Sequence, residues 1–244
     1  MILHGRPASL HILNLGAFAV RAGRMIGIPA FLVTTDQGER VLVDTGFRDG
    51  YGTDPAAAGV ADGLDPFGHL VDFTPQNLIV AQLALLGLAP SDLDLLILTH
   101  SHIDHIGGLP HVTHLPIIIG AEERALPRPL YWAGVQPMAW PQAEWRAVHE
   151  DTDIGPHFTV LHVPGHTPGQ LALRFDLPQT GRVLITSDAI SRPSEPDEGF
   201  GDAHNPGLAL AHAARLLAMK ADLCIWGHCP MQWKTLRTAP DYYS

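Results

Sequence analysis

The chain has 244 residues, of which 46% are hydrophobic and 16% are charged, a composition typical of a folded globular protein with a sizeable core. Its 15 Lys and Arg against 25 Asp and Glu give a formal net charge of −10, and no block of basic residues occurs. Because nucleic acids and anionic membranes bind clustered positive charge, we expect neither of them as a partner.

We expect a single cytoplasmic domain over residues 1–244. No stretch approaches the roughly 18 uninterrupted apolar residues that a membrane-spanning helix needs, and the N-terminus lacks the basic and apolar segments of a secretory signal. Cys224 and Cys229 are too few for a disulfide framework, and their spacing is not CxxC.

Short apolar runs bounded by Gly and Pro predict strands along the whole chain. The expected strands cover residues 9–20, 28–35, 40–44, 93–99, 116–120, 158–163, 170–175, 182–187 and 223–227. Helices are expected over residues 74–87, 205–220 and 230–237. Two runs of strands, each followed by helix, indicate an α/β (α+β) fold with two sheets in the middle and helices outside.

In two segments the apolar residues recur with no clear helical or strand spacing. Residues 47–73, rich in Gly, Pro, Asp and Ala, are expected to form a long connection, which in a compact domain is usually functional or mobile. Residues 121–150 form a proline-interrupted insert that carries Trp132, Trp140 and Trp145.

Histidine is unusually frequent, with 15 residues, and it is clustered. Residues 100–105 read HSHIDH and are followed by two closely spaced glycines. Side chains at positions i and i+2 of an extended segment point to the same side, so His100 and His102 can share one ion. The chain then turns, which can bring Asp104 and His105 to a second position nearby. Such ligands suit zinc and are acceptable to iron, manganese or cobalt.

Two other interpretations of this cluster are a polar surface loop and a metal-free catalytic histidine pair. Its position between a buried strand and the two glycines disfavours the surface loop. More ligands are expected at later strand ends, where His166 lies in PGHTPG, Asp188 follows VLITS and His228 follows LCIWG. Each alone could be structural, for example as a helix cap, but the three recur at comparable places.

Together, these motifs resemble the metallo-β-lactamase superfamily, and the pattern spans residues 44–228. The resemblance implies an αββα sandwich of two mixed sheets flanked by helices, with the site at the edge between the sheets. Asp44, in VLVDTG, matches the early Asp of the superfamily and is expected to steady the histidine loop rather than to bind metal. The implied ligands are His100, His102 and His166 for one ion, Asp104, His105 and His228 for the other, and Asp188 as the bridge.

The layout is most similar to the N-acyl homoserine lactonases. A bridging Asp separates the chain from the β-lactamases proper. The excess of acidic over basic residues disfavours the RNA-processing branch of the superfamily. As in these lactonases, a Gln and a basic residue, here Gln232 and Lys234, follow the last histidine. Lactonases of this type commonly carry a Tyr a few residues beyond the bridging Asp, where it contacts the substrate carbonyl. Ser191 takes that place here.

The resemblance therefore implies a dinuclear metal-dependent hydrolase that opens a lactone ring, with N-acyl homoserine lactones as the expected substrates and quorum quenching as the outcome. Two divalent ions, expected to be zinc, lower the pKa of a shared water, and the bridging hydroxide attacks the carbonyl. Asp188 would set the separation of the ions. Asp104 is hypothesised to pass a proton to the leaving oxygen, so both carboxylates are expected to be catalytic.

The alternatives within this fold are a glyoxalase-II-like thioesterase and a phosphoesterase. Both need basic side chains for an anionic substrate, and only Arg192 and Lys234 are candidates. A di-iron redox protein would typically carry Glu in the HxHxDH region and a flavin domain, which this sequence lacks.

The substrate is expected to be a small molecule with an acyl or lactone group. Ser191, Phe67, Met138 and Trp140 are the candidate contacts, since residues 47–73 and 121–150 could form an apolar pocket. The same apolar residues suit a homodimer interface or ordinary packing, and pattern alone does not separate these outcomes.

Overall fold

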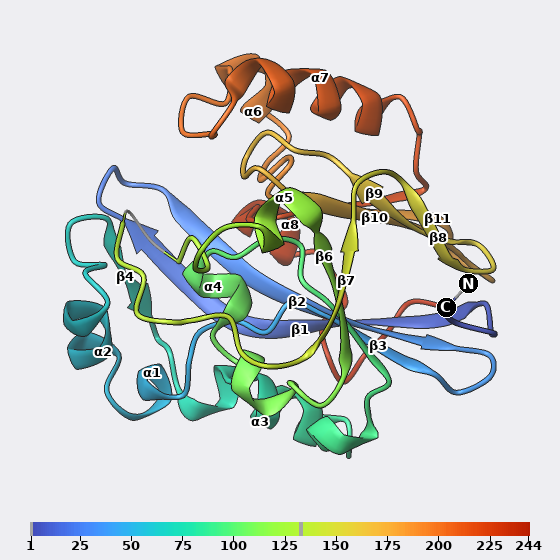
Figure 1. Cartoon of the computed structure of the whole chain (residues 1–244), viewed down its shortest axis with the longest axis horizontal. Helices are drawn as coiled ribbons and strands as arrows, with labels where there is room; N and C mark the ends of the chain where they lie inside the picture. The colour runs from blue at the N-terminus through green and yellow to red at the C-terminus, as the bar shows by residue number, and fades with distance from the viewer. Residues whose placement is uncertain (1, 132–133) are drawn as a thin grey trace.

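Two stacked β-sheets lie between two layers of helices in the computed structural model, which describes residues 2–131 and 134–244 (Figure 1). The α/β sandwich of two mixed sheets is therefore confirmed. Within the described residues, no helix has both the length and the apolar character needed to cross a membrane.

The first sheet has seven strands in the order β4-β1-β2-β3-β5-β6-β7. The strands β1, β2, β3 and β4 pair antiparallel, whereas β3, β5, β6 and β7 pair parallel, so the sheet is mixed. The bounds are β1 Pro7–Val20, β2 Met25–Thr35, β3 Arg40–Val43, β4 Gly68–Val71, β5 Leu95–Ile97, β6 Pro116–Gly120 and β7 Glu144–Val148.

The second sheet has five strands in the order β12-β11-β10-β9-β8. Only β11 and β12 pair parallel, and the neighbours of β10 run antiparallel to it, so β9, β11 and β12 share one direction. Their carboxyl ends therefore reach the same edge of the sheet. The bounds are β8 Thr152–Gly155, β9 Phe158–His162, β10 Leu171–Leu177, β11 Gly181–Ser187 and β12 Leu223–Trp226.

The helices are short except on the outer face of the second sheet, where the longest one begins at Pro206 and is capped by the Asn205 side chain. The α-helices are α1 Gly50–Thr53, α2 Pro55–Ala61, α3 Ile79–Leu85, α4 Ile103–Ile106, α5 Ala121–Arg124, α6 Glu195–Glu198, α7 Pro206–Leu217 and α8 Pro230–Trp233. The single-turn 3-10 helices are η1 Pro75–Asn77, η2 Pro90–Asp92 and η3 Leu109–His111.

Along each strand, successive side chains point to opposite faces of the sheet, and this alternation builds the apolar layers on both faces. In β2, Phe31 and Val33 enter the core between the sheets, whereas Leu32 enters the core under the helices of the first sheet. In β11, Val183 packs between the sheets and Leu184 packs towards α7. Because successive strand side chains point to opposite faces, continuous apolar strands serve two cores at once.

The two segments without a clear period are more regular than expected. Residues 47–73 contain α1, α2 and the edge strand β4, and residues 121–150 begin with α5 and end in the edge strand β7. The pairing of β7 with β6 and of β4 with β1 comes from contacts far along the sequence, which local pattern does not show. The strand β8 was not expected, and α8 ends four residues before the expected limit of residue 237. Trp132 lies outside the described residues.

Candidate metal centre

Four loops meet at one edge of the sandwich, and each follows the carboxyl end of a strand. The segment after β5 carries His100 and His102 and continues into α4. His166 follows β9, Asp188 follows β11 and His228 follows β12. Since β9, β11 and β12 run in the same direction, their following residues converge beside the end of β5.

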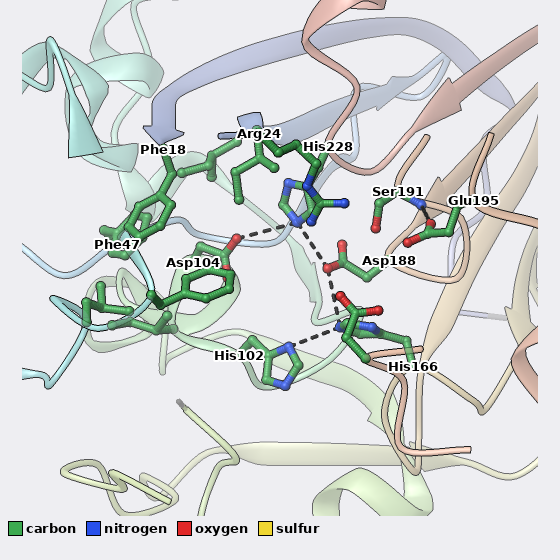
Figure 2. Close-up of a pocket in the computed structure, with 16 residues that line it drawn as sticks. Phe18, Arg24, Phe47, His102, Asp104, His166, Asp188, Ser191, Glu195 and His228 are labelled. Carbon is green, nitrogen blue, oxygen red and sulfur yellow. Dashed lines mark hydrogen bonds and ion pairs between the residues drawn. The ribbon is translucent and has the colours of Figure 1, made fainter. Parts of the chain in front are cut away.

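The first group of side chains contains three histidines and one carboxylate, whose ligand atoms all lie within 4.8 Å of one another. His102 Nδ1 is 3.0 Å from His100 Nε2 and 3.1 Å from His166 Nε2. Asp188 Oδ2 is 3.4 Å from His166 Nε2 and 3.8 Å from His100 Nε2. Figure 2 shows His102, His166 and Asp188 turned towards one another at the floor of a pocket.

The second group, Asp104, His105 and His228, meets the same 4.8 Å criterion. Asp104 Oδ2 is 3.6 Å from His105 Nε2 and 3.5 Å from His228 Nε2. Asp188 also faces this group, because its Oδ1 is 3.6 Å from His105 Nε2 and its Oδ2 is 3.0 Å from His228 Nε2. Asp188 is therefore the one carboxylate of the seven side chains that faces both groups.

Two buried atoms in this cluster test whether a metal fits. Within the described residues, neither His105 Nε2 nor Asp188 Oδ1 has a hydrogen-bond partner. Burying such atoms without a partner is unfavourable, and both are lone-pair donors that a cation would satisfy. Five imidazoles and two carboxylates in two adjoining groups fit two divalent ions.

The electrostatics of the cluster favour cations. Burial lowers the pKa of His100 and His102 well below the ordinary value, so both rings stay neutral and can offer lone pairs. Burial alone would also lower the pKa of His105, but nearby carboxylates, Asp104 first, raise it to about 10. The surrounding histidines, His228 first, outweigh burial and hold the pKa of Asp188 well below its usual range. The negative field that raises this pKa would equally favour a metal ion, which would take the place of the proton on His105 Nε2.

Partners behind the cluster orient its rings. Asp44, 1% exposed, accepts hydrogen bonds from Thr99 N at 2.8 Å, Thr99 Oγ1 at 2.7 Å and His105 Nδ1 at 2.8 Å. His228 Nδ1 donates to Gly27 O at 2.7 Å. The bonds from His105 and His228 place the proton of each ring on Nδ1 and leave its Nε2 facing the cluster. Asp44 lies behind His105 and does not belong to either ligand group.

Glu123 on α5 is a residue that sequence reasoning missed. Its side chain is fully buried and accepts hydrogen bonds from Ser101 N at 2.9 Å, from the Ser101 hydroxyl and from Gly169 N at 3.2 Å. Ser101 lies between His100 and His102, and Gly169 lies in the turn that carries His166. One carboxylate thus joins two of the four loops. The AEER segment itself contains no signal for this role.

The glycine pair after the histidine cluster is required by close packing. A Cβ on Gly107 would lie 2.1 Å from Arg48 N, and a Cβ on Gly108 would lie 2.8 Å from Thr45 O. Backbone atoms at these distances cannot move aside independently. The glycines therefore let the segment after Asp44 pack directly against the end of α4.

Tyr131 joins the histidine loop to the end of α2. Its backbone N donates to Ser101 O at 2.9 Å, and its backbone O accepts from Ile103 N at 3.0 Å. Its hydroxyl donates to Asp62 Oδ2 at 2.9 Å. Asp62, at the end of α2, also accepts hydrogen bonds from Arg48 Nε at 3.0 Å and Nη2 at 3.2 Å. This buried network connects α2 to the backbone around His102.

Tyr131→Phe is expected to lower the free energy of unfolding by about 1–2 kcal/mol, because a buried carboxylate loses one hydrogen bond while the ring packing remains. Urea unfolding of the metal-loaded protein measures this change. Tyr242→Phe, at an exposed ring, should leave the unfolding free energy within about 0.5 kcal/mol. Equal effects of the two substitutions would show that the Asp62 bond is not important.

The cluster forms the floor of a pocket of about 270 Å³. Ser191 and Phe67, two of the expected substrate contacts, line it, but Met138 and Trp140 are not among the described residues that do. Trp140 instead donates to Leu126 O at 2.8 Å and packs against Trp145, and Met138 packs at the margin of the core beneath the first sheet. Phe47 and Leu64 also line it, from the 47–73 segment that was expected to form a pocket. The described lining residues that sequence reasoning missed include Phe18, Arg24, Glu195 and Asp202.

These missed residues come from the β1–β2 hairpin, from α6 and from the segment that follows α6, which reach the site only in the folded chain. Figure 2 shows Phe18 and Phe47 on one side of the pocket and Ser191 and Glu195 on the other. Glu195 is buried and accepts a hydrogen bond from Ser191 N, and burial raises the pKa of its carboxyl.

Comparison with known proteins agrees with this geometry. The sequence model of the metallo-beta-lactamase superfamily matches residues 25–228. The N-acyl homoserine lactonase AiiA of Bacillus thuringiensis subsp. kurstaki is 30% identical over 233 residues, which cover 92% of this chain and 90% of AiiA. The N-acyl homoserine lactonase AttM of Azorhizobium caulinodans is 28% identical over 238 residues, covering 89% of this chain and 88% of AttM.

A solved structure of an N-acyl homoserine lactone hydrolase, with the product N-hexanoyl-L-homoserine bound at its catalytic metal centre, superposes with a TM-score of 0.84. It is 26% identical in sequence, and the superposition covers 98% of this chain and 100% of that chain. The family match extends over all four loops of the metal centre. The chain belongs to the metallo-beta-lactamase superfamily.

Proposed function

We propose that this protein is a metal-dependent hydrolase that opens the ring of N-acyl homoserine lactones. The observation that carries the proposal is the pair of ligand groups that meet at Asp188 on the floor of the pocket. The two lactonase relatives, whose similarity extends over most of both chains, support the choice of substrate.

The proposed ligands of one ion are His100, His102 and His166, those of the other are Asp104, His105 and His228, and Asp188 serves both. We propose zinc as the metal, because imidazole and carboxylate donors suit it, although iron, manganese and cobalt accept the same donors. When bound, the ions supply a water of lowered pKa and positive charge for the carbonyl oxygen of the substrate.

The residues of the chain position these groups and handle the proton. Asp188 holds the two ligand groups together from a buried position at the floor of the pocket, so their separation changes little during turnover. The carboxylate of Asp104 lines the pocket and faces His228 (Figure 2). We propose that Asp104 takes up the proton of the attacking water and passes it to the ring oxygen, which remains attached to the opened product.

The charge of the pocket supports a neutral substrate. Apart from histidines, Arg24 is the only basic residue among the described residues of the lining. Four carboxylates, Asp104, Asp188, Glu195 and Asp202, line the same pocket. With Asp104 and Asp188 assigned to the proposed ions, the rest of the described lining offers Arg24 alone to pair with the carboxylates of a glutathione thioester, whereas an uncharged lactone needs no such partner.

Proton release at constant pH from zinc-loaded protein given N-decanoyl homoserine lactone tests the function. We expect rapid acid production that stops after dialysis against a chelator and returns when zinc is added. No acid production by protein that retains two equivalents of zinc would overturn the lactone assignment, and thioesters and other lactones would be tested next.

We also propose that the chain acts as one domain in the cytoplasm. One apolar core is shared by strands of both sheets, from Leu10 in β1 to Ile225 in β12, which supports a single unit. The unpaired state of Cys224 and Cys229 supports a reducing compartment.

A further inference from the structure

Thr99 immediately precedes His100 but belongs to neither ligand group. Its side chain is fully buried. Its backbone is held from both sheets: Thr99 N donates to Asp44 Oδ1, after β3, at 2.8 Å, and Thr99 O accepts from Leu171 N, at the start of β10, at 2.8 Å. The hydroxyl of Thr99 therefore has a fixed position between the sheets, behind the ligands.

The hydrogen bonds of the Thr99 hydroxyl decide which nitrogen of His100 carries the proton. The hydroxyl donates to Asp44 Oδ2 at 2.7 Å and accepts from Ser187 Oγ at 2.8 Å, and His100 Nδ1 lies 3.2 Å from the same oxygen. A hydroxyl has one proton to donate, and Asp44 takes it, so His100 Nδ1 can only be a donor. A neutral imidazole has one N–H, and His100 therefore turns the lone pair of Nε2 towards the first ligand group.

The same hydroxyl reaches the second ligand group through Asp44. Asp44 Oδ2 accepts both from the Thr99 hydroxyl and from His105 Nδ1, the latter at 2.8 Å. His100 and His105, one histidine from each group, are thus joined behind the cluster by a chain of three hydrogen bonds. Such bonds support one another in a buried place, so loss of the central hydroxyl should disturb both rings.

Ser187 connects the carboxylate that both groups share to the same point. It ends β11 and directly precedes Asp188. Its φ of +45° is a left-handed conformation, which costs free energy in a residue other than glycine. The hydrogen bond to Thr99 on one side and close packing on the other hold this turn, since a Cβ on Gly227 would overlap Ser187 O. Thr99 therefore also helps to aim Asp188.

We propose that Thr99 is a positioning residue for both ion positions, an inference that rests on the two-ion assignment of the proposed function. Its hydroxyl orients the His100 ring directly and the His105 ring through Asp44. Through Ser187 it also fixes the turn that carries the shared carboxylate. One buried oxygen thus holds a ligand of each group together with the ligand that they have in common.

Thr99→Val removes the hydroxyl and keeps the shape of the side chain, whereas Thr99→Ser keeps the hydroxyl and loses a methyl group. We expect Thr99→Val to weaken binding of both zinc equivalents by roughly 10–100-fold and Thr99→Ser to stay within about threefold of wild type, measured by competition with a chelator of known affinity. Thr159→Val is the matched control, because Thr159 is 7% exposed and its hydroxyl bonds to Asp153 and Arg174, outside both ligand groups. The control should leave both zinc affinities unchanged.

Proton exchange at the imidazoles gives a second readout, which a general loss of stability would not produce. In protein with ¹⁵N-labelled histidine at saturating zinc, the Nδ1 proton of His100 should exchange slowly in wild type and in Thr99→Ser. In Thr99→Val it should exchange roughly tenfold faster or more, because its acceptor is gone. The Nδ1 proton of His228 is the internal reference and should exchange at one rate in all three proteins, since it is bonded to Gly27 O at 2.7 Å.

Weaker binding of only one zinc equivalent in Thr99→Val would confine Thr99 to one ligand group and overturn the proposal. Equal losses in Thr99→Val and Thr99→Ser would assign the effect to packing and overturn it too, as would zinc bound to Nδ1 of His100 in wild type. If Thr99→Val does not fold, Ser187→Ala, which removes one donor to the Thr99 hydroxyl, should still weaken zinc binding roughly 3–10-fold, and unchanged binding would contradict the proposal.

The proposed function fails in a different way. Wild type that binds two zinc equivalents and opens no lactone would overturn the proposed reaction, and the zinc affinities would still decide the role of Thr99. Wild type that binds only one equivalent would overturn the two-ion assignment and this inference with it.

Discussion

Asp188→Asn is expected to lower kcat/KM for lactone opening by on the order of 10³-fold or more, because Asp188 is the one proposed ligand that both ion positions share. The carboxylate of Asp188 lies 3.0 Å from His228 Nε2 and 3.4 Å from His166 Nε2, so it faces both proposed ion positions. An amide of the same shape removes the negative charge that both positions share. At least one ion should therefore be lost, together with activation of the water.

Metal analysis after gel filtration, combined with initial rates, measures this effect. Asp176→Asn is the matched control, because Asp176 lies on β10 with its side chain 45% exposed and pairs only with surface groups. The control should retain two equivalents of zinc and full turnover. A variant at Asp188 that kept both ions and wild-type turnover would falsify the bridging role.

Glu123→Ala is expected to have the largest effect on folding, lowering the free energy of unfolding by about 3–5 kcal/mol. The substitution leaves Ser101 N, the Ser101 hydroxyl and Gly169 N without their acceptor in a fully buried place. The loops that carry His102 and His166 then lose the side chain that joins them. Binding of the first zinc ion should weaken at the same time, by roughly 10–100-fold.

The neighbouring residue provides the control for this prediction. Glu122 lies on the same helix turn, but its side chain is 46% exposed and pairs with His162 at 2.9 Å on the surface. Glu122→Ala should change the unfolding free energy by at most about 1 kcal/mol and leave zinc affinity unchanged. Urea unfolding of both variants, with and without zinc, separates the two residues. Similar results for Glu122 and Glu123 would show that the buried hydrogen bonds do not hold the loops.

The amino-acid sequence by itself determined which side chains gather at the metal centre. The sequence supplies all seven proposed ligands as candidates: four lie in the HSHIDH segment, and His166, Asp188 and His228 follow strands, a pattern whose assignment to two ions rests on the resemblance to the superfamily. The spacing of the HSHIDH segment and the apolar strands that precede Asp188 and His228 are readable over a few residues. The strand pattern predicted two sheets with helices outside, and the resemblance to the superfamily implied the αββα sandwich.

Only the tertiary structure decided what surrounds the centre. The strands β4, β7 and β8 lie at sheet edges, where pairing with distant strands rather than local pattern makes them regular. Trp140 is as apolar in sequence as Phe67, yet only Phe67 lines the pocket. In the sequence, Glu123 cannot be told apart from its neighbour Glu122. In the folded chain Glu122 is exposed, whereas Glu123 is packed against the turn that contains Gly169. Pocket walls and buried acceptors depend on which distant segments meet, and short-range sequence carries little information about those contacts.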